Sequence, residues 1–188
     1  MRYGALMLRL LACISVFVAV AIAGCGSSSS STTSGVPAAS YVKAVCTAAR
    51  GWASDIDTRI GALNVATIKN ATQGKAAIQT FFKAAVADTA DVVAKLQSAG
   101  QPSIDNGKAI AATFVSAFAR IEHALKTGQS QANALPTDNP TAFRDAGRKL
   151  ATSVQNSLNN IGSGLSGLRS PELESAAKKV AACAPLAS

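Results

Sequence analysis

The chain has 188 residues, of which 48% are hydrophobic and only 5% aromatic, and its formal net charge is +8. This hydrophobic fraction is enough to form the core of one domain, and a composition rich in alanine and poor in aromatic residues favours packed helices over strands. The basic residues are scattered along the chain, which excludes the clustered charge typical of a nucleic-acid-binding protein.

Residues 1–24 have the order of charges and apolar residues expected of an export signal. Arg2 and Arg9 precede an apolar run over residues 10–23 that a single serine interrupts. A membrane-spanning helix needs about 20 apolar residues, so this run is short for a permanent anchor and suits a cleaved signal. Because both arginines and no acid lie in the leader, its removal lowers the net charge from +8 to +6.

The leader ends on Ile22-Ala23-Gly24, and Cys25 and a serine-rich stretch follow. Small residues before a cysteine at this place resemble the lipobox of bacterial lipoproteins, where a peptidase cuts in front of the cysteine. The resemblance implies that Cys25 becomes the lipid-bearing first residue of the mature protein. The protein would then be lipid-anchored at the extracytoplasmic face of the cell membrane. An ordinary cleaved signal without a lipid is the alternative.

The mature chain divides into a tether and one helical domain. Residues 25–37 hold the lipidated cysteine and a Ser/Thr-rich segment that lacks the apolar side chains needed for a core, so we expect a flexible tether. Residues 38–188 are predicted to form the domain.

The apolar residues of this domain recur three or four positions apart, which predicts helices and no strands. The predicted helices cover about residues 40–63, 75–98, 103–127, 139–168 and 170–183. Four long helices with short connections predict an all-α fold, an up-down-up-down four-helix bundle with a short fifth C-terminal helix. The tether would then lie at the same end as the turn at 100–102, and loops 64–74 and 127–139 at the other.

Several single residues carry these helix assignments. Gly100 is expected as a left-handed cap, and Ser103, Asn139 and Ser170 as N-caps. Thr89 is the polar member of the second helix's apolar stripe, and its hydroxyl is expected to bond to the carbonyl of Ala85.

The four cysteines have separate roles by position. Cys13 leaves with the leader and Cys25 is the predicted lipid site. Cys46 and Cys183 remain, near the two ends of the domain, and in an exported chain a disulfide between them is the favoured interpretation. Two free thiols or a pair of metal ligands are the alternatives, although two cysteines and one distant histidine make a poor metal site.

No motif of a catalytic or cofactor-binding site withstands inspection. The glycines of residues 162–167 spell a dinucleotide-binding pattern, but helical periodicity continues through them and no acidic residue follows at the required distance. His123 is the only histidine, and nothing in the sequence pairs it with a serine and an acid. Glycoside cleavage needs two carboxylates that face each other; Asp88 and Asp91 are one turn apart and could share a face, but a repulsive surface pair is the favoured interpretation. We therefore expect no enzyme and no cofactor.

The basic residues with the closest spacing suggest a surface for anionic polymers or lipids, with a solvated face as the alternative. They are Arg144, Arg148, Lys149, Lys178 and Lys179.

Several caps, turns and paired cysteines occur together along the chain. They are Tyr41-Val42-Lys43-Ala44-Val45-Cys46 with Trp52, Asp105-Asn106-Gly107-Lys108-Ala109, Ala134-Leu135-Pro136-Thr137-Asp138-Asn139-Pro140, Ser170-Pro171-Glu172-Leu173 and Ala182-Cys183. With these motifs the chain resembles a group of small secreted or lipid-anchored helical proteins of actinobacteria that have no assigned activity. The resemblance implies a fold and a location, and it carries over no catalytic residue.

The sequence thus predicts a non-enzymatic cell-surface lipoprotein, held at the membrane by the lipid on Cys25, whose bundle binds an envelope protein or an anionic polymer. The alternative function is a carrier that holds a small apolar ligand in a cavity between the helices. Such a cavity would be lined by Trp52, Phe82, Phe114 and Phe118.

Overall fold

The computed structural model describes residues 35–63, 68–165 and 170–186. The predicted signal 1–24 and residues 25–34 of the predicted tether lie outside the described residues. The described part is helical, with one isolated backbone bridge. Its elements are α2 (Ala38–Ala62), α3 (Ala71–Ser98), α4 (Gly107–Asn133), α5 (Pro140–Leu165), α6 (Pro171–Lys179) and the 3-10 helix η2 (Ala181–Leu186).

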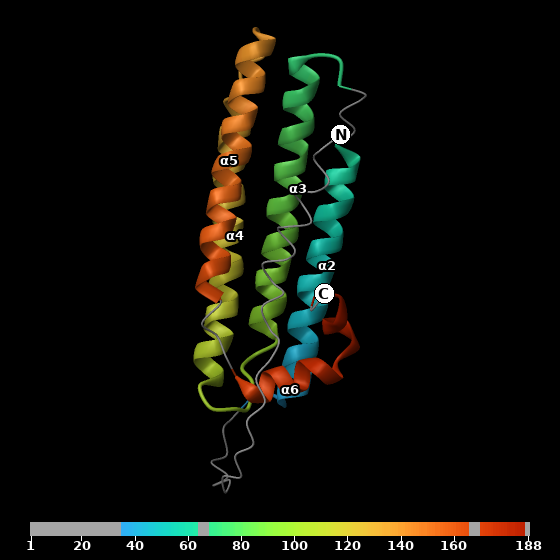
Figure 1. Cartoon of the computed structure of the whole chain (residues 1–188), viewed down its shortest axis with the longest axis vertical. Helices are drawn as coiled ribbons and strands as arrows, with labels where there is room; N and C mark the ends of the chain where they lie inside the picture. The colour runs from blue at the N-terminus through green and yellow to red at the C-terminus, as the bar shows by residue number, and fades with distance from the viewer. Residues whose placement is uncertain (1–34, 64–67, 166–169, 187–188) are drawn as a thin grey trace, which may run out of the picture.

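The four long helices run alternately up and down, as predicted (Figure 1). Among the described residues, their main contacts join neighbours in the chain: α2 with α3, α3 with α4 and α4 with α5. The outer helices of this array are therefore α2 and α5. The short α6 lies across the end at which α2 starts, and both α6 and η2 pack against α2 (Figure 1). We call this the tether end, and the opposite one the distal end.

The core divides into three groups of apolar side chains along the array. The group toward the distal end joins α3, α4 and α5 and includes Phe82, Leu125 and Leu150. The group toward the tether end joins α2, α3 and α4 and includes Leu96 and Phe118. A third, smaller group joins α2 to the C-terminal segment. The apolar stripes read from the sequence thus meet where an antiparallel arrangement requires.

Helix α3 begins at Ala71, four residues before the predicted start. The side chain of Asn70 accepts a hydrogen bond from the backbone N–H of Gln73 at 2.9 Å. In return, the side-chain oxygen of Gln73 accepts one from the N–H of Lys69 at 2.9 Å. The first bond satisfies a backbone donor that a helix start leaves unpaired, and the second fixes the residue just before the cap. The prediction of a loop through residue 74 was wrong because the polar first turn hides this cap.

Helix α4 differs from its prediction at both ends. It begins at Gly107, four residues after Ser103, the predicted cap. The N–H of Ser103 bonds to the carbonyl of Val36 at 2.8 Å, and residues 103–106 form turns before the helix. The chain instead enters the helix through Asn106, whose φ is 57°. At its other end α4 continues to Asn133 through the polar run 127–133. Buried Gly128 and Ala132 let this last part of α4 pack closely on its neighbours, so tertiary contact overrides the weak apolar signal.

The predicted caps at Gly100, Asn139 and Ser170 are confirmed. Gly100 has a φ of 72°, in the left-handed region. The side chain of Asn139 accepts from the N–H groups of Thr141 and Ala142 at 2.9 and 3.0 Å. Ser170 Oγ accepts from the N–H of Leu173 at 3.4 Å.

The predicted last helix is broken in two. Val180 adopts extended backbone angles, which end α6 at Lys179, and Cys183 lies in η2 instead of in a continuing helix. The break allows η2 to turn back along α2, which a straight helix lying across the end could not do (Figure 1).

A pair of glycine substitutions tests the close packing of α3, α4 and α5. A Cβ on Gly128 would lie 2.4 Å from a ring carbon of buried Phe82 and 3.1 Å from Val154, whereas a Cβ on Gly51 has nothing within 4 Å. We expect Gly128→Ala to lower the free energy of unfolding by about 1–3 kcal/mol through overpacking. Gly51→Ala should raise it by about 0.5–1 kcal/mol, because alanine favours the helix. Urea unfolding followed by circular dichroism measures both, and equal effects would contradict the packing described.

Candidate functional site: the tether end

The chain enters the bundle through a short backbone clamp at the tether end. The N–H of Val36 donates to the carbonyl of Gln101 at 2.9 Å, and the carbonyl of Val36 accepts from Ser103 at 2.8 Å. These bonds form a parallel bridge between Val36 and Pro102. Pro102 is almost fully buried. The point at which any N-terminal tether leaves the bundle is therefore fixed beside the α3–α4 turn.

The first turn of α2 adds buried side chains to this end. Tyr41 is 2% exposed and Val42 7%. Desolvation by burial raises the pKa of Tyr41 to about 12, so its phenol is neutral at physiological pH. The start of α2 is thus anchored by packing as well as by the clamp.

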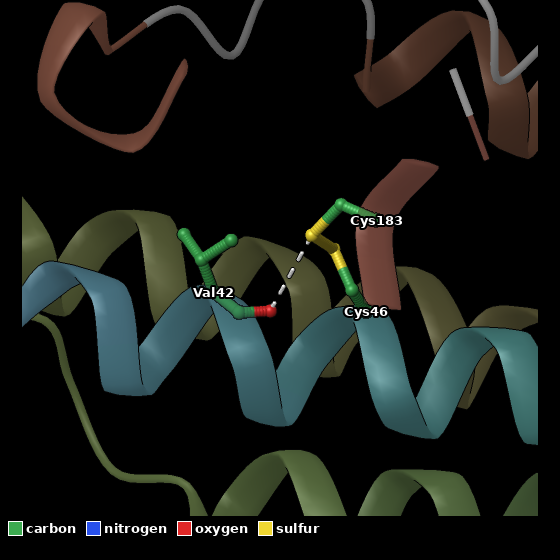
Figure 2. The surroundings of a disulfide bond; sticks show 3 residues. All are labelled: Val42, Cys46 and Cys183. Atoms are coloured by element: carbon green, nitrogen blue, oxygen red, sulfur yellow. Dashed lines mark hydrogen bonds between the residues drawn. A yellow bond between two sulfur atoms is a disulfide. The ribbon is translucent and has the colours of Figure 1, made fainter. Parts of the chain in front are cut away.

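The predicted disulfide between Cys46 and Cys183 is present (Figure 2). It joins α2 to η2 across 137 residues of sequence, with the two Cα atoms 5.1 Å apart. Figure 2 also draws a contact of 4.0 Å between the sulfur of Cys183 and the carbonyl of Val42. Because a disulfide sulfur carries no proton, this is a packing contact.

A small apolar cluster surrounds the disulfide. Its buried members are Val42, Ala176 and Cys183, and half-buried side chains from α2 and the C-terminal segment complete it. Helix α6 has only 9 residues, too few for stability on its own. The cluster and the disulfide therefore hold the C-terminal segment in place.

The aromatic side chains that would line a ligand cavity belong to two different groups. Phe82 packs in the core toward the distal end, whereas Trp52, Phe114 and Phe118 lie in the group toward the tether end. The rings of Trp52 and Phe118 meet edge to face, with centroids 5.6 Å apart. These side chains fill space between helices, so no observation among the described residues favours the carrier.

Trp52 also takes part in a buried polar link between α2 and α3. Its indole N–H donates to the hydroxyl of Thr89 at 2.9 Å, and that hydroxyl donates to the carbonyl of Ala85 at 2.7 Å. The bond from Thr89 to Ala85 was predicted, but the role of the hydroxyl as acceptor for Trp52 was not. The sequence placed both on the inner faces of their helices without giving their register.

Asp88 is half-buried and paired, which the sequence did not reveal. Arg59 of α2 forms a bidentate ion pair with it, and the bond from Arg59 Nη2 to Asp88 Oδ1 is 2.8 Å. This hydrogen bond raises the pKa of Arg59 above its usual value. Asp91 is exposed. The two aspartates therefore do not form a carboxylate pair, and Asp88 instead joins α2 to α3.

The remaining sequence candidates are spread over the surface. His123 is exposed on α4. Residues 162–165 of the glycine-rich motif are helical, as expected, and residues 166 and 167 lie outside the described residues. A shallow hollow on the outer face of α5 is lined by that helix alone.

The structure divides the predicted basic group. Arg144, Arg148 and Lys149 lie in the half of α5 nearer the distal end, while Lys178 and Lys179 end α6 at the tether end (Figure 1). Arg148 is paired with Asp145 on the same helix. The long axis of α5 separates the two parts, so they cannot form one binding surface.

Comparisons of the chain with protein-family models, with curated proteins and with solved structures found no match. The resemblance to actinobacterial helical proteins therefore stays a prediction. Of the described helices, none is both long and apolar enough to cross a membrane. The predicted lipid site, Cys25, lies outside the described residues, ten positions before Gly35.

Removal of the disulfide is expected to destabilise the whole domain. A closed loop of this length restricts the unfolded chain by about 5 kcal/mol in loop-closure entropy. We expect Cys46→Ala/Cys183→Ala to lower the free energy of unfolding by about 3–5 kcal/mol, measured by urea unfolding. Cys25→Ser is the matched control and should leave stability unchanged. A loss below about 1 kcal/mol in the double variant would show that the bond does not support the fold.

The link between Trp52 and Thr89 gives a second stability prediction. Thr89→Val keeps the shape of the side chain but removes the acceptor of the Trp52 N–H, so we expect a loss of about 1–3 kcal/mol in unfolding free energy. Thr80→Val is the control, since Thr80 makes the same bond to a carbonyl one turn earlier but is exposed. Its effect should stay within about 0.5 kcal/mol. Equal effects in urea unfolding would argue against the link.

Proposed function

We propose that this protein is a lipid-anchored cell-surface lipoprotein, a non-enzymatic helical module held at the extracytoplasmic face of the membrane through Cys25. The observation that carries the proposal is the sequence Ile22-Ala23-Gly24-Cys25 at the end of an apolar leader. Acyl chains on the cysteine would hold the protein at the bilayer, since two chains suffice for stable anchoring.

The disulfide supports the location. Cys46 and Cys183 are joined in the fold. Such bonds persist in oxidising compartments outside the cytoplasm and are rare within it. An exported chain accounts for both the leader and the bond.

The clamp at Val36 supports the arrangement of tether and bundle. Cys25 lies ten positions before Gly35, a length that would span about 17 Å on average as a flexible coil and at most about 35 Å. The tether end would therefore stay close to the bilayer. The long helices have 25–28 residues, which places the distal end about 40 Å further away.

The distal end is then the part of the bundle that an envelope protein or anionic polymer would meet first. Its α4–α5 connection is held by two bonds from α3. Lys75 Nζ donates to the carbonyl of Leu135 at 2.9 Å, and the side chain of Gln79 donates to that of Asn133 at 3.0 Å. A connection held in this way presents a fixed shape, which suits the recognition of a partner.

The proposal is tested by the mass of the natural amino terminus. We expect protein from the membrane fraction of a lipoprotein-processing bacterium to begin at Cys25 and to carry acyl chains. Cys25→Ser should lower the membrane-bound fraction by at least about tenfold, because the remaining attraction is weak. Cys13→Ser is the matched control and should change neither the mass nor the location. An unacylated mature terminus, or equal membrane retention of the Cys25→Ser variant, would refute the proposal.

A further inference from the structure

The tether end gathers exposed lysines from four helices. Each lies within the first or last turns next to this end, or on α6 where it crosses the end (Figure 1). They are Lys43 of α2, Lys95 of α3, Lys108 of α4, and Lys178 and Lys179 of α6. We call this group the tether-end lysines.

Within the described part of the chain, none of the tether-end lysines takes part in an ion pair or a side-chain hydrogen bond. Several cations elsewhere are engaged: Arg59 with Asp88, Lys126 with Glu122 and Arg148 with Asp145. Lys75 is bonded to a backbone carbonyl. The tether-end lysines are thus available to an external anion, whereas these others have partners in the fold.

Three acidic residues share this end. Asp105 and Glu172 are exposed, and Glu174 is half-buried. One oxygen of Glu172 already accepts a hydrogen bond from Ser170 Oγ at 2.8 Å. The lysines outnumber these acids, so the surface keeps a positive charge.

We propose that the tether-end lysines dock the bundle on anionic lipid headgroups. This deepens the proposed function, on which it rests for bringing this end to a bilayer. A tether of ten residues holds the end near the headgroups, and charges on opposing surfaces attract once they lie within a Debye length of about 8–10 Å. The docked bundle would then stand with its distal end away from the membrane.

The test uses the mature chain without its lipid. Residues 25–188 carrying Cys25→Ser are mixed with vesicles of equal parts phosphatidylglycerol and phosphatidylcholine, and binding is measured by co-sedimentation. We expect binding at low salt that weakens steeply as salt is added. The triple variant Lys108→Gln/Lys178→Gln/Lys179→Gln should bind more weakly by on the order of 100-fold.

The control removes the same charge from α5. Arg144→Gln/Arg148→Gln/Lys149→Gln should change vesicle binding by less than about threefold, since these residues lie on the other half of the bundle. Matching unfolding midpoints establish that both triple variants are folded. An equal loss in the two variants would overturn the proposal, as would equal binding to pure phosphatidylcholine vesicles or no binding to the anionic ones.

Two further outcomes separate this inference from others. Tighter binding to soluble poly(glycerol phosphate) than to vesicles of the same charge would overturn the assignment to lipid in favour of a wall polymer. The vesicle assay uses a chain without acyl groups, so a failure to bind would overturn the docking on lipid headgroups only. The proposed lipid anchor is decided separately, by the mass of the natural terminus. Conversely, an unacylated natural terminus with intact vesicle binding would refute only the anchor.

Discussion

The disulfide between Cys46 and Cys183 is the constraint on which the shape of this molecule most depends. The four long helices pack mainly with their neighbours in the chain, so the main long partner of α2 is α3, and Trp52 of α2 also reaches Phe118 of α4. The part of α2 next to the tether end is also packed by α6 and η2, which the disulfide attaches to it. The C-terminal segment thereby adds packing to α2 at this end, where a closed four-helix bundle would use its fourth long helix. Restricting the unfolded chain across 137 residues also offsets the small core of an alanine-rich protein.

Much of this architecture could be predicted from sequence because helical periodicity and caps are local signals. Residues close in sequence give the apolar stripes on α2 to α5 and the caps at Asn139 and Ser170. The pairing of the two cysteines follows from the expectation that the chain is exported. The cap at Asn70 was also visible as Asn followed three residues later by Gln, but a polar first turn masked it. Thr89 combines a predictable and an unpredictable contact, since its bond to Ala85 lies within one helix and its bond to Trp52 joins two helices.

The features that escaped prediction are those that join distant segments. Ser103 reads as a helix cap until the bridge between Val36 and Pro102 is known, which is followed by turns over residues 103–106 before α4 begins. Asp88 reads as half of a repulsive pair until the register of α2 brings Arg59 opposite it. The basic residues of α5 and α6 read as one group although the length of a helix lies between them. In each case the missing information is the relative placement of two elements, which a local pattern does not contain. The predicted lipid site at Cys25 lies outside the described residues and rests on sequence alone.

The bridge at Val36 has a mechanical consequence for a chain held by its amino terminus. A pull along the N-terminal segment acts first on the two hydrogen bonds that join Val36 to Gln101 and Ser103. The load passes into the connection between α3 and α4, the central pair of the array, before it reaches the first turn of α2. Ten positions after Val36, Cys46 joins α2 to the C-terminal segment through the disulfide. A force on the N-terminal tether would thus be shared by several helices and would not separate α2 from the bundle on its own.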